Sequence, residues 1–162
     1  MILKNIIEED FVNYKKPSMV LGFPICKNFK CDKECGQQVC QNSALATAPS
    51  IEVNPMDLYK RYNSNPITKA VICQGLEPLD SEEDLWLFIS GFRLYCNKED
   101  DIIVYTGYNE SEIKDERIWD MFQTYNVIVK FGRYIPNQTP HYDEVLGVYL
   151  ASDNQYAKSF NK

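Results

Sequence analysis

The sequence predicts an α/β protein, folded as an open partial (β/α) barrel with a mostly parallel sheet. Two observations lead to this prediction: apolar, strand-like runs alternate with helical patterns, and the 162 residues hold only a few such units. Alternating strands and helices favour parallel strands joined by right-handed crossovers. A closed eight-stranded barrel typically takes about 250 residues, so an open sheet is expected.

The first expected elements lie on either side of a polar loop. Residues 1–17 are a lead-in without a defined element. Residues 18–24 form a buried strand, because they are apolar and end at a proline. A helix then begins at Pro55, with Asn54 as its N-cap, and continues through Tyr62.

The second expected strand, residues 69–73, is almost continuously apolar, as a strand covered on both faces would be. A turn at 74–79 leads into a helix, where Asp80 and Glu83 fit a capping box. Apolar residues recur there at helical spacing. The remaining expected elements are a third strand at 101–106, a helical region at about 109–124, a fourth strand at 126–131 and a possible fifth strand at 144–150.

Residues 1–162 are expected to form a single domain, because a chain of this length buries a sizeable core without cross-links. The net charge of −6 argues against nucleic-acid and anionic-membrane partners, since both call for a basic patch. No apolar run approaches the roughly 20 residues of a membrane span, and the first residues lack a signal-peptide core. A cytoplasmic protein is therefore expected.

The polar loop at residues 22–43 holds four of the six cysteines, at positions 26, 31, 35 and 40. In a reducing compartment, clustered cysteines are more often metal ligands or catalytic groups than disulfides. The loop lacks the CxxC spacing of structural zinc sites, which makes zinc the less favoured metal. An iron–sulfur cluster needs thiolates on a loop that wraps around it, and this spacing suits one. The remaining Cys73 and Cys96, and the lone His141, receive no role.

The run CKNFKCDKEC follows a buried strand and resembles the CxxxCxxC loop of the radical S-adenosylmethionine (SAM) enzymes. In that superfamily three cysteines hold a [4Fe–4S] cluster and leave one iron open for SAM. Both gaps, Cys26 to Cys31 and Cys31 to Cys35, are one residue longer here. Cys40-Gln41-Asn42 resembles the last cysteine and His-Asn of one subfamily. Which of the four cysteines is spare stays open, with Cys26 and Cys31 slightly favoured as ligands.

A second motif follows the second strand: QGLEP resembles the GGEP motif, which binds the amino group of SAM in radical SAM enzymes. The resemblance assigns Gly75, Leu76 and Glu77 to SAM binding. An ammonium needs acceptors, and a glycine turn lets backbone oxygens approach closely. Leu76 replaces the second glycine of the motif.

Three further segments resemble the subfamily that activates anaerobic ribonucleotide reductases. They are IVYTGY at 103–108, VKFGR at 129–133 and SDNQ at 152–155. The resemblance places Thr106, Gly107 and Tyr108 on the rim of the SAM site. It also implies that Asn154 and Gln155 hydrogen-bond the nucleoside or organise that rim. Lys130 stands where the subfamily usually has an acid, which leaves its role open.

The resemblance implies a radical SAM oxidoreductase that cleaves SAM reductively to a 5′-deoxyadenosyl radical. Its substrate would be a glycine of the large subunit of an anaerobic ribonucleotide reductase, with an electron donor such as flavodoxin. The loop at 136–142 is the expected partner-facing segment. Three alternatives stay open: a minimal radical SAM enzyme acting on a small molecule, a non-catalytic zinc or iron–sulfur binding module, and an iron–sulfur electron carrier.

Overall fold

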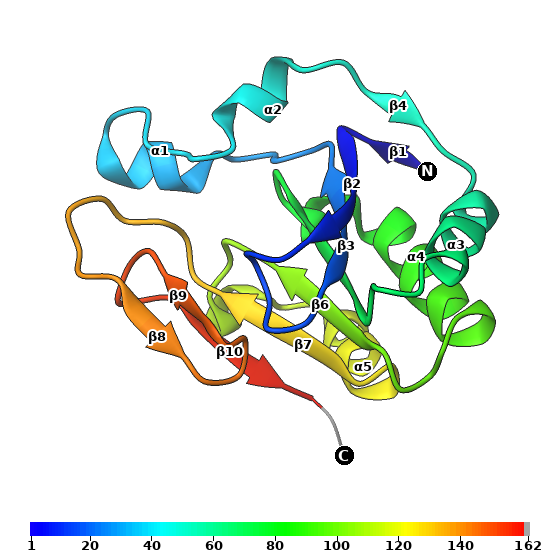
Figure 1. Ribbon diagram of the computed structural model, residues 1–162. Helices are drawn as coiled ribbons and strands as arrows, with labels where there is room; N and C mark the ends of the chain where they lie inside the picture. The colour runs from blue at the N-terminus through cyan, green and yellow to red at the C-terminus, as the bar shows by residue number, and fades with distance from the viewer. Residues whose placement is uncertain (161–162) are drawn as a thin grey trace.

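The computed structural model describes residues 1–160, which form one central sheet with helices on one of its faces (Figure 1). The strand order is β10–β7–β6–β5–β3–β2. The four inner strands run parallel, and the two outermost strands pair antiparallel with their neighbours. The strands are β2 (Asn5–Asp10), β3 (Ser18–Phe23), β5 (Ala70–Gly75), β6 (Asp101–Tyr105), β7 (Val127–Phe131) and β10 (Tyr156–Ser159). The predicted α/β class and mostly parallel sheet are confirmed.

The inner strands bury both faces, which explains their nearly continuous apolar sequences. Side chains alternate between the two faces with a period of two. On one face Leu21, Val71 and Val104 pack under the helices α3 (Pro55–Ser64), α4 (Glu82–Tyr95) and α5 (Glu116–Thr124). On the other face Val20 and Ile72 pack under Tyr14 and the hairpin of β8 (His141–Asp143) and β9 (Val148–Leu150).

The lead-in at residues 1–17 was expected to lack a defined element, and that prediction is wrong. It forms β1 (Ile2–Leu3), which pairs with β4 (Ile51–Glu52), and β2, which pairs antiparallel with β3. The sequence of β2, NIIEED, carries no clear period. Its conformation depends on the edge of β3, whose backbone groups need a partner.

Helix α3 begins as predicted, because the Asn54 side chain accepts a hydrogen bond from the backbone N–H of Met56 at 3.0 Å. The predicted capping box of Asp80 and Glu83 is wrong. Asp80 lies in a 3₁₀ turn, η1 (Pro78–Ser81), and α4 begins at Glu82. The helical region expected at 109–124 is divided into η2 (Glu110–Glu112) and α5.

The possible fifth strand predicted at 144–150 is confirmed only in part. Only Val148–Leu150 is extended, and it pairs with β8 in a separate hairpin. The sheet is completed instead by β10, which pairs with β7 and which the sequence did not predict. Its four residues, YAKS, are mostly exposed, so no apolar pattern marks them.

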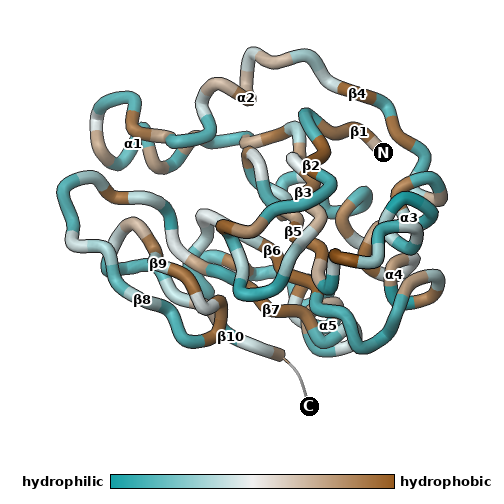
Figure 2. Tube along the Cα trace, in the orientation of Figure 1, coloured by the Kyte–Doolittle hydropathy of each residue, from teal (hydrophilic) through white to brown (hydrophobic). Residues whose placement is uncertain are grey.

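The cysteine loop contains the short helix α1 (Lys30–Cys35) and ends where a second short helix, α2 (Ser43–Thr47), begins. In Figure 2 hydrophobic residues concentrate in the central strands, while α1 is mainly hydrophilic. Within these two described helices no residue is fully buried. The helices of residues 1–160 are all too short or too polar to cross a membrane.

Gly75 is the last residue of β5 and lies beside the last residue of β3. It pairs with Phe23 and has a φ of 104°, a conformation that favours glycine. A Cβ at this position would lie 2.6 Å from the backbone nitrogen of Phe23. A glycine is therefore needed for the chain to turn from β5 into the segment carrying Glu77.

Replacing Gly75 by alanine is expected to lower the free energy of unfolding by about 1–3 kcal/mol from backbone strain, and the contact with β3 adds to the loss. Urea unfolding followed by circular dichroism measures the change. Gly36→Ala is the matched control: Gly36 also has a positive φ, 64°, but its Cβ position has nothing within 4 Å. Equal losses in the two variants would contradict the role given to the contact between β3 and β5.

Candidate functional site

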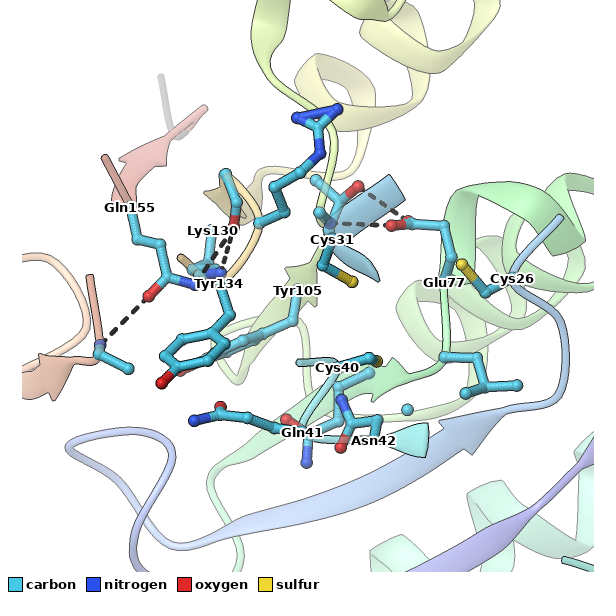
Figure 3. A pocket seen from close by; sticks show the side chains of 18 of the residues that line it. Cys26, Cys31, Cys40, Gln41, Asn42, Glu77, Tyr105, Lys130, Tyr134 and Gln155 are labelled. Carbon is cyan, nitrogen blue, oxygen red and sulfur yellow. Dashed lines mark hydrogen bonds between the residues drawn. The ribbon is translucent and has the colours of Figure 1, made fainter. Parts of the chain in front are cut away.

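A pocket of about 340 Å³ lies at the carboxyl ends of the four parallel strands. This edge of a parallel sheet is where α/β proteins bind ligands. In Figure 1 the cysteine loop with α1 lies on one side of this edge and the β8–β9 hairpin lies on the other. Residues that line the pocket include Cys26, Cys31, Cys40, Glu77, Lys130 and Gln155. Figure 3 shows the three cysteines at one end and Gln155 with Tyr134 at the other.

The four cysteines of the loop are partly buried free thiols, but the structure does not bring all of them together. Cys26, Cys31 and Cys40 line the pocket, whereas Cys35 lies outside its lining. The Cys26 sulfur accepts a hydrogen bond from the backbone N–H of Phe29 at 3.3 Å. The site therefore presents three thiols from two segments of the loop.

Cys31 and Cys40 lie side by side, and each thiol changes the pKa of the other. The thiolate of Cys40 accepts a hydrogen bond from the Cys31 thiol, which lowers the pKa of Cys40 to about 7 against the effect of burial. The same contact, with burial, raises the pKa of Cys31 well above its ordinary value. The contact thus favours the thiolate at Cys40 and the neutral thiol at Cys31.

Ion pairs at both ends of helix α1, which carries Cys31, connect it to the segments that follow β6 and β7. Lys30 donates to Glu112 at 2.7 Å, and Glu112 also accepts two hydrogen bonds from Arg133 at 2.7 and 2.8 Å. The Arg133 Nε lies 3.4 Å from Glu34 at the other end of α1. Because the Arg133 side chain is only 5% exposed, this network fixes the helix to a rigid part of the protein.

Glu77 is buried beside the pocket, where the ends of β5 and β6 meet. Its carboxylate accepts hydrogen bonds from the Thr106 hydroxyl and the Gly107 N–H, both at 2.8 Å, and from the Leu79 N–H at 3.2 Å. Burial raises its pKa to about 7, although the three hydrogen bonds lower it. Glu77 therefore holds the turn after β5 against the segment after β6, and Figure 3 shows its carboxylate facing the pocket.

Lys130, whose role the sequence left open, is a buried cation at the floor of the pocket. It is 7% exposed, and its ammonium donates to the Gly132 carbonyl oxygen at 2.6 Å. Burial lowers its pKa to about 8, while the charges of Glu77 and Cys31 raise it. An ammonium carries three donors, so this lysine has donors to offer a negatively charged ligand.

The other predicted SAM-site residues are partly brought together. Gly75, Leu76, Thr106 and Gly107 line the pocket with Glu77. Asn154 lies outside the lining, and its side-chain amide donates to the Arg133 carbonyl oxygen at 2.9 Å. Asn154 therefore holds the segment after β7 in place without lining the pocket itself.

Gln155, expected with Asn154 at the SAM site, lines the pocket, and its side-chain amide donates to the Gly132 carbonyl oxygen at 3.3 Å. Two other pocket residues were not predicted from the sequence. Tyr105 and Tyr134 form part of the wall. Both tyrosines lie at or just after the end of a parallel strand, and this position in the sequence could have predicted them as pocket residues. The expected partner-facing loop at 136–142 ends within β8.

Within residues 1–160, no three Cys, His, Asp or Glu side chains converge as they would around a single metal ion. No protein-family model, curated protein or solved structure matches the chain. The function of the site is therefore argued from its own residues.

The raised pKa of Glu77 predicts a pH-dependent stability. Between its ordinary value of 4.5 and about 7, the folded protein binds a proton that the unfolded chain has released. Stability due to Glu77 is therefore greatest below this window and falls, by up to roughly 3 kcal/mol, as the pH rises through it. Glu77→Gln removes this titration, so the variant is expected to gain stability relative to the unaltered protein as the pH rises.

Urea unfolding at a series of pH values, with a chelator present, measures the difference. Glu112→Gln is a control of opposite sign. Burial raises the pKa of Glu112, but hydrogen bonds from Asn109 and Lys30 and the charge of Arg133 outweigh it, so this pKa is lowered. A difference for Glu77→Gln that does not change with pH would contradict the raised pKa.

Proposed function

We propose that this chain is a radical SAM enzyme, with a [4Fe–4S] cluster on three cysteines of the loop and SAM in the adjoining pocket. The observation that carries the proposal is the pocket itself. Three thiols, the buried Glu77 turn and the buried Lys130 all line one cavity at the carboxyl ends of parallel strands. These groups come from segments that are far apart in the sequence.

The number of cysteines in the pocket matches a cluster that uses three thiolates and leaves one iron open. A structural zinc site needs four ligands around one atom, and residues 1–160 contain no such convergence. A cubic cluster places its thiolates around a larger body, as the separate positions of Cys26 and of the Cys31–Cys40 pair would allow. A free iron remains when three cysteines are used.

The fold is consistent with a partial (β/α) barrel of the radical SAM type. The parallel strands β3, β5, β6 and β7 are adjacent in chain order, and helices α3, α4 and α5 pack on one face. Consecutive strands with all crossovers on one side form a segment of a barrel wall. The other face is covered by Tyr14 and the β8–β9 hairpin.

When bound, a reduced [4Fe–4S] cluster supplies the electron for homolytic cleavage of SAM to a 5′-deoxyadenosyl radical. The protein's own residues bind and orient SAM. The Lys130 ammonium attracts the carboxylate of the methionine moiety, and the carbonyl oxygens of the turn at Gly75 and Leu76 accept from its ammonium. Glu77 fixes this turn to Thr106, so the two sides of the SAM site keep their spacing.

The pocket size favours a protein substrate. About 340 Å³ is near the lower end of the roughly 300–1,000 Å³ of small-molecule sites. A bound SAM molecule leaves little room for a second small substrate, so the hydrogen donor approaches from outside. We propose a backbone glycine in the large subunit of an anaerobic ribonucleotide reductase, with an electron donor such as flavodoxin in the cytoplasm. A small-molecule substrate is the second candidate.

Anaerobic reconstitution with iron and sulfide tests the proposal. The protein is expected to turn brown, to bind about four irons per chain and to produce 5′-deoxyadenosine from SAM and dithionite. With the reductase added, electron paramagnetic resonance is expected to show a glycyl-radical doublet. A colourless protein that binds stoichiometric zinc would instead support a non-catalytic module, and a cluster without SAM cleavage would support an electron carrier.

Lys130→Met is expected to weaken SAM binding by about 10-fold or more, equivalent to about 1.4 kcal/mol, because the buried cation is lost while its volume is kept. Equilibrium dialysis on cluster-loaded protein measures the affinity, and iron analysis verifies the loading. Lys158→Met is the matched control, since Lys158 is half exposed and pairs with Glu110 on the sheet edge. Unchanged affinity in Lys130→Met would remove Lys130 from the SAM site.

A further inference from the structure

We propose that Cys26, Cys31 and Cys40 are the cluster ligands, that Cys35 is spare, and that Asp32 is the positioning residue that selects Cys40. This inference rests on the proposed function. It would make the ligand spacing C-x4-C-x8-C, in place of the CxxxCxxC spacing that the loop resembles. The conformation of residues 32–40 would bring Cys40 next to Cys31 in spite of the longer second gap.

Asp32 folds the end of the loop back over helix α1. Its Oδ1 accepts hydrogen bonds from the backbone N–H groups of Val39 and Cys40, both at 2.7 Å. Its carbonyl oxygen also accepts from the N–H of Gln37 at 3.2 Å, and Gly36 ends the helix with a φ of 64°. Hydrogen bonds from N–H groups to a carboxylate are strong. They hold the Cys40 backbone next to the first turn of α1, where Cys31 lies.

Cys35 shares a face of α1 with Cys31 but lies one helical turn farther along the helix. Four residues of α-helix advance the chain by about 6 Å. Cys35 is the last residue of α1 and lies outside the pocket lining, although it is partly buried. The ion pairs of Lys30 and Glu34 with the network of Glu112 and Arg133 prevent α1 from sliding to bring Cys35 inward.

Cys26 is positioned separately, on the Glu77 side of the pocket. The backbone N–H of the next residue, Lys27, donates to Asp80 at 2.6 Å, and Asp80 also accepts from the Tyr108 hydroxyl at 2.9 Å. Figure 3 shows Cys26 and the Cys31–Cys40 pair around the same part of the pocket. Each of the three proposed ligands is thus fixed by a carboxylate or an ion pair from this chain.

Cluster assembly in single cysteine variants tests the ligand set. After anaerobic reconstitution, Cys35→Ala is expected to keep the iron content and absorbance of the unaltered protein. Cys26→Ala, Cys31→Ala and Cys40→Ala are each expected to lose most of both. Loss in Cys35→Ala with retention in Cys40→Ala would overturn the inference and leave the proposed function intact. Failure of the unaltered protein to take up iron would overturn both.

Separate variants test the positioning role of Asp32. Asp32→Ala removes the oxygen that accepts both hydrogen bonds and is expected to lower iron affinity by roughly 10–100-fold, as loss of a supporting contact does in metal sites. Asp32→Asn keeps an acceptor oxygen and is expected to restore part of that loss. Lys33→Ala, at an exposed position of the same helix, is the matched control. An Asp32→Ala protein with unchanged iron affinity would overturn the positioning role.

Disulfide mapping tests the same geometry without metal. In metal-free protein, diamide is expected to accept two electrons and two protons from a thiol pair, giving mainly a Cys31–Cys40 disulfide and the reduced hydrazine. Peptide mass spectrometry identifies the pair. In Asp32→Ala the yield is expected to shift toward disulfides of Cys35. A dominant Cys31–Cys35 disulfide in the unaltered protein would overturn the inference, whatever the protein does with SAM.

Discussion

The cysteine loop depends on carboxylates that accept hydrogen bonds or ion pairs, because it has almost no hydrophobic core of its own. Asp32 and Asp80 bind backbone N–H groups of the loop, and Glu112 binds Lys30 at the start of α1. A loop without buried apolar surface gains little from the hydrophobic effect, so these polar contacts decide its conformation. The acidic residues next to the cysteines therefore act as hydrogen-bond acceptors that hold the loop in place.

The sheet supplies the rigid half of the site. Buried strands end together at one edge, and each end delivers a different group: Gly75 and the Glu77 turn from β5, Thr106 after β6, and Lys130 from β7. Glu77 and Lys130 are both buried. Burial raises the pKa of Glu77 and lowers the pKa of Lys130, so it favours the neutral form of each side chain. Isolated buried charges are costly. Their persistence beside a cavity is typical of a ligand site, since a zwitterionic ligand would compensate both.

The sequence predicted the parts of the fold that carry a strong local signal. The four parallel strands and α3 followed from apolar runs and the Asn54–Pro55 start. Elements that depend on a distant partner were missed: β2 and β10 are mixed in polarity and become strands only because β3 and β7 present edges. Asp80 had the local pattern of a helix cap, yet it binds Lys27 and Tyr108 across the fold. Motif spacing likewise placed four cysteines in one loop, but their division into pocket-lining and outlying residues required the conformation at Asp32.

The same polar anchoring has a thermodynamic consequence for the proposed cluster. A ligand that binds only the folded form of a protein also stabilises that form. Ligation of three thiolates by a cluster would therefore stabilise the conformation of a loop that is otherwise held by polar contacts. The ion pairs at both ends of α1 reduce that ordering cost in advance, since the helix already lies against Arg133 and Glu112. The short segment after Gly36 is held by Asp32, which accepts hydrogen bonds from the N–H groups of Gln37, Val39 and Cys40. In the proposed ligand set, Asp32 therefore selects Cys40 over Cys35. The contacts of Lys27 with Asp80 and of Lys30 with Glu112 position Cys26 and Cys31.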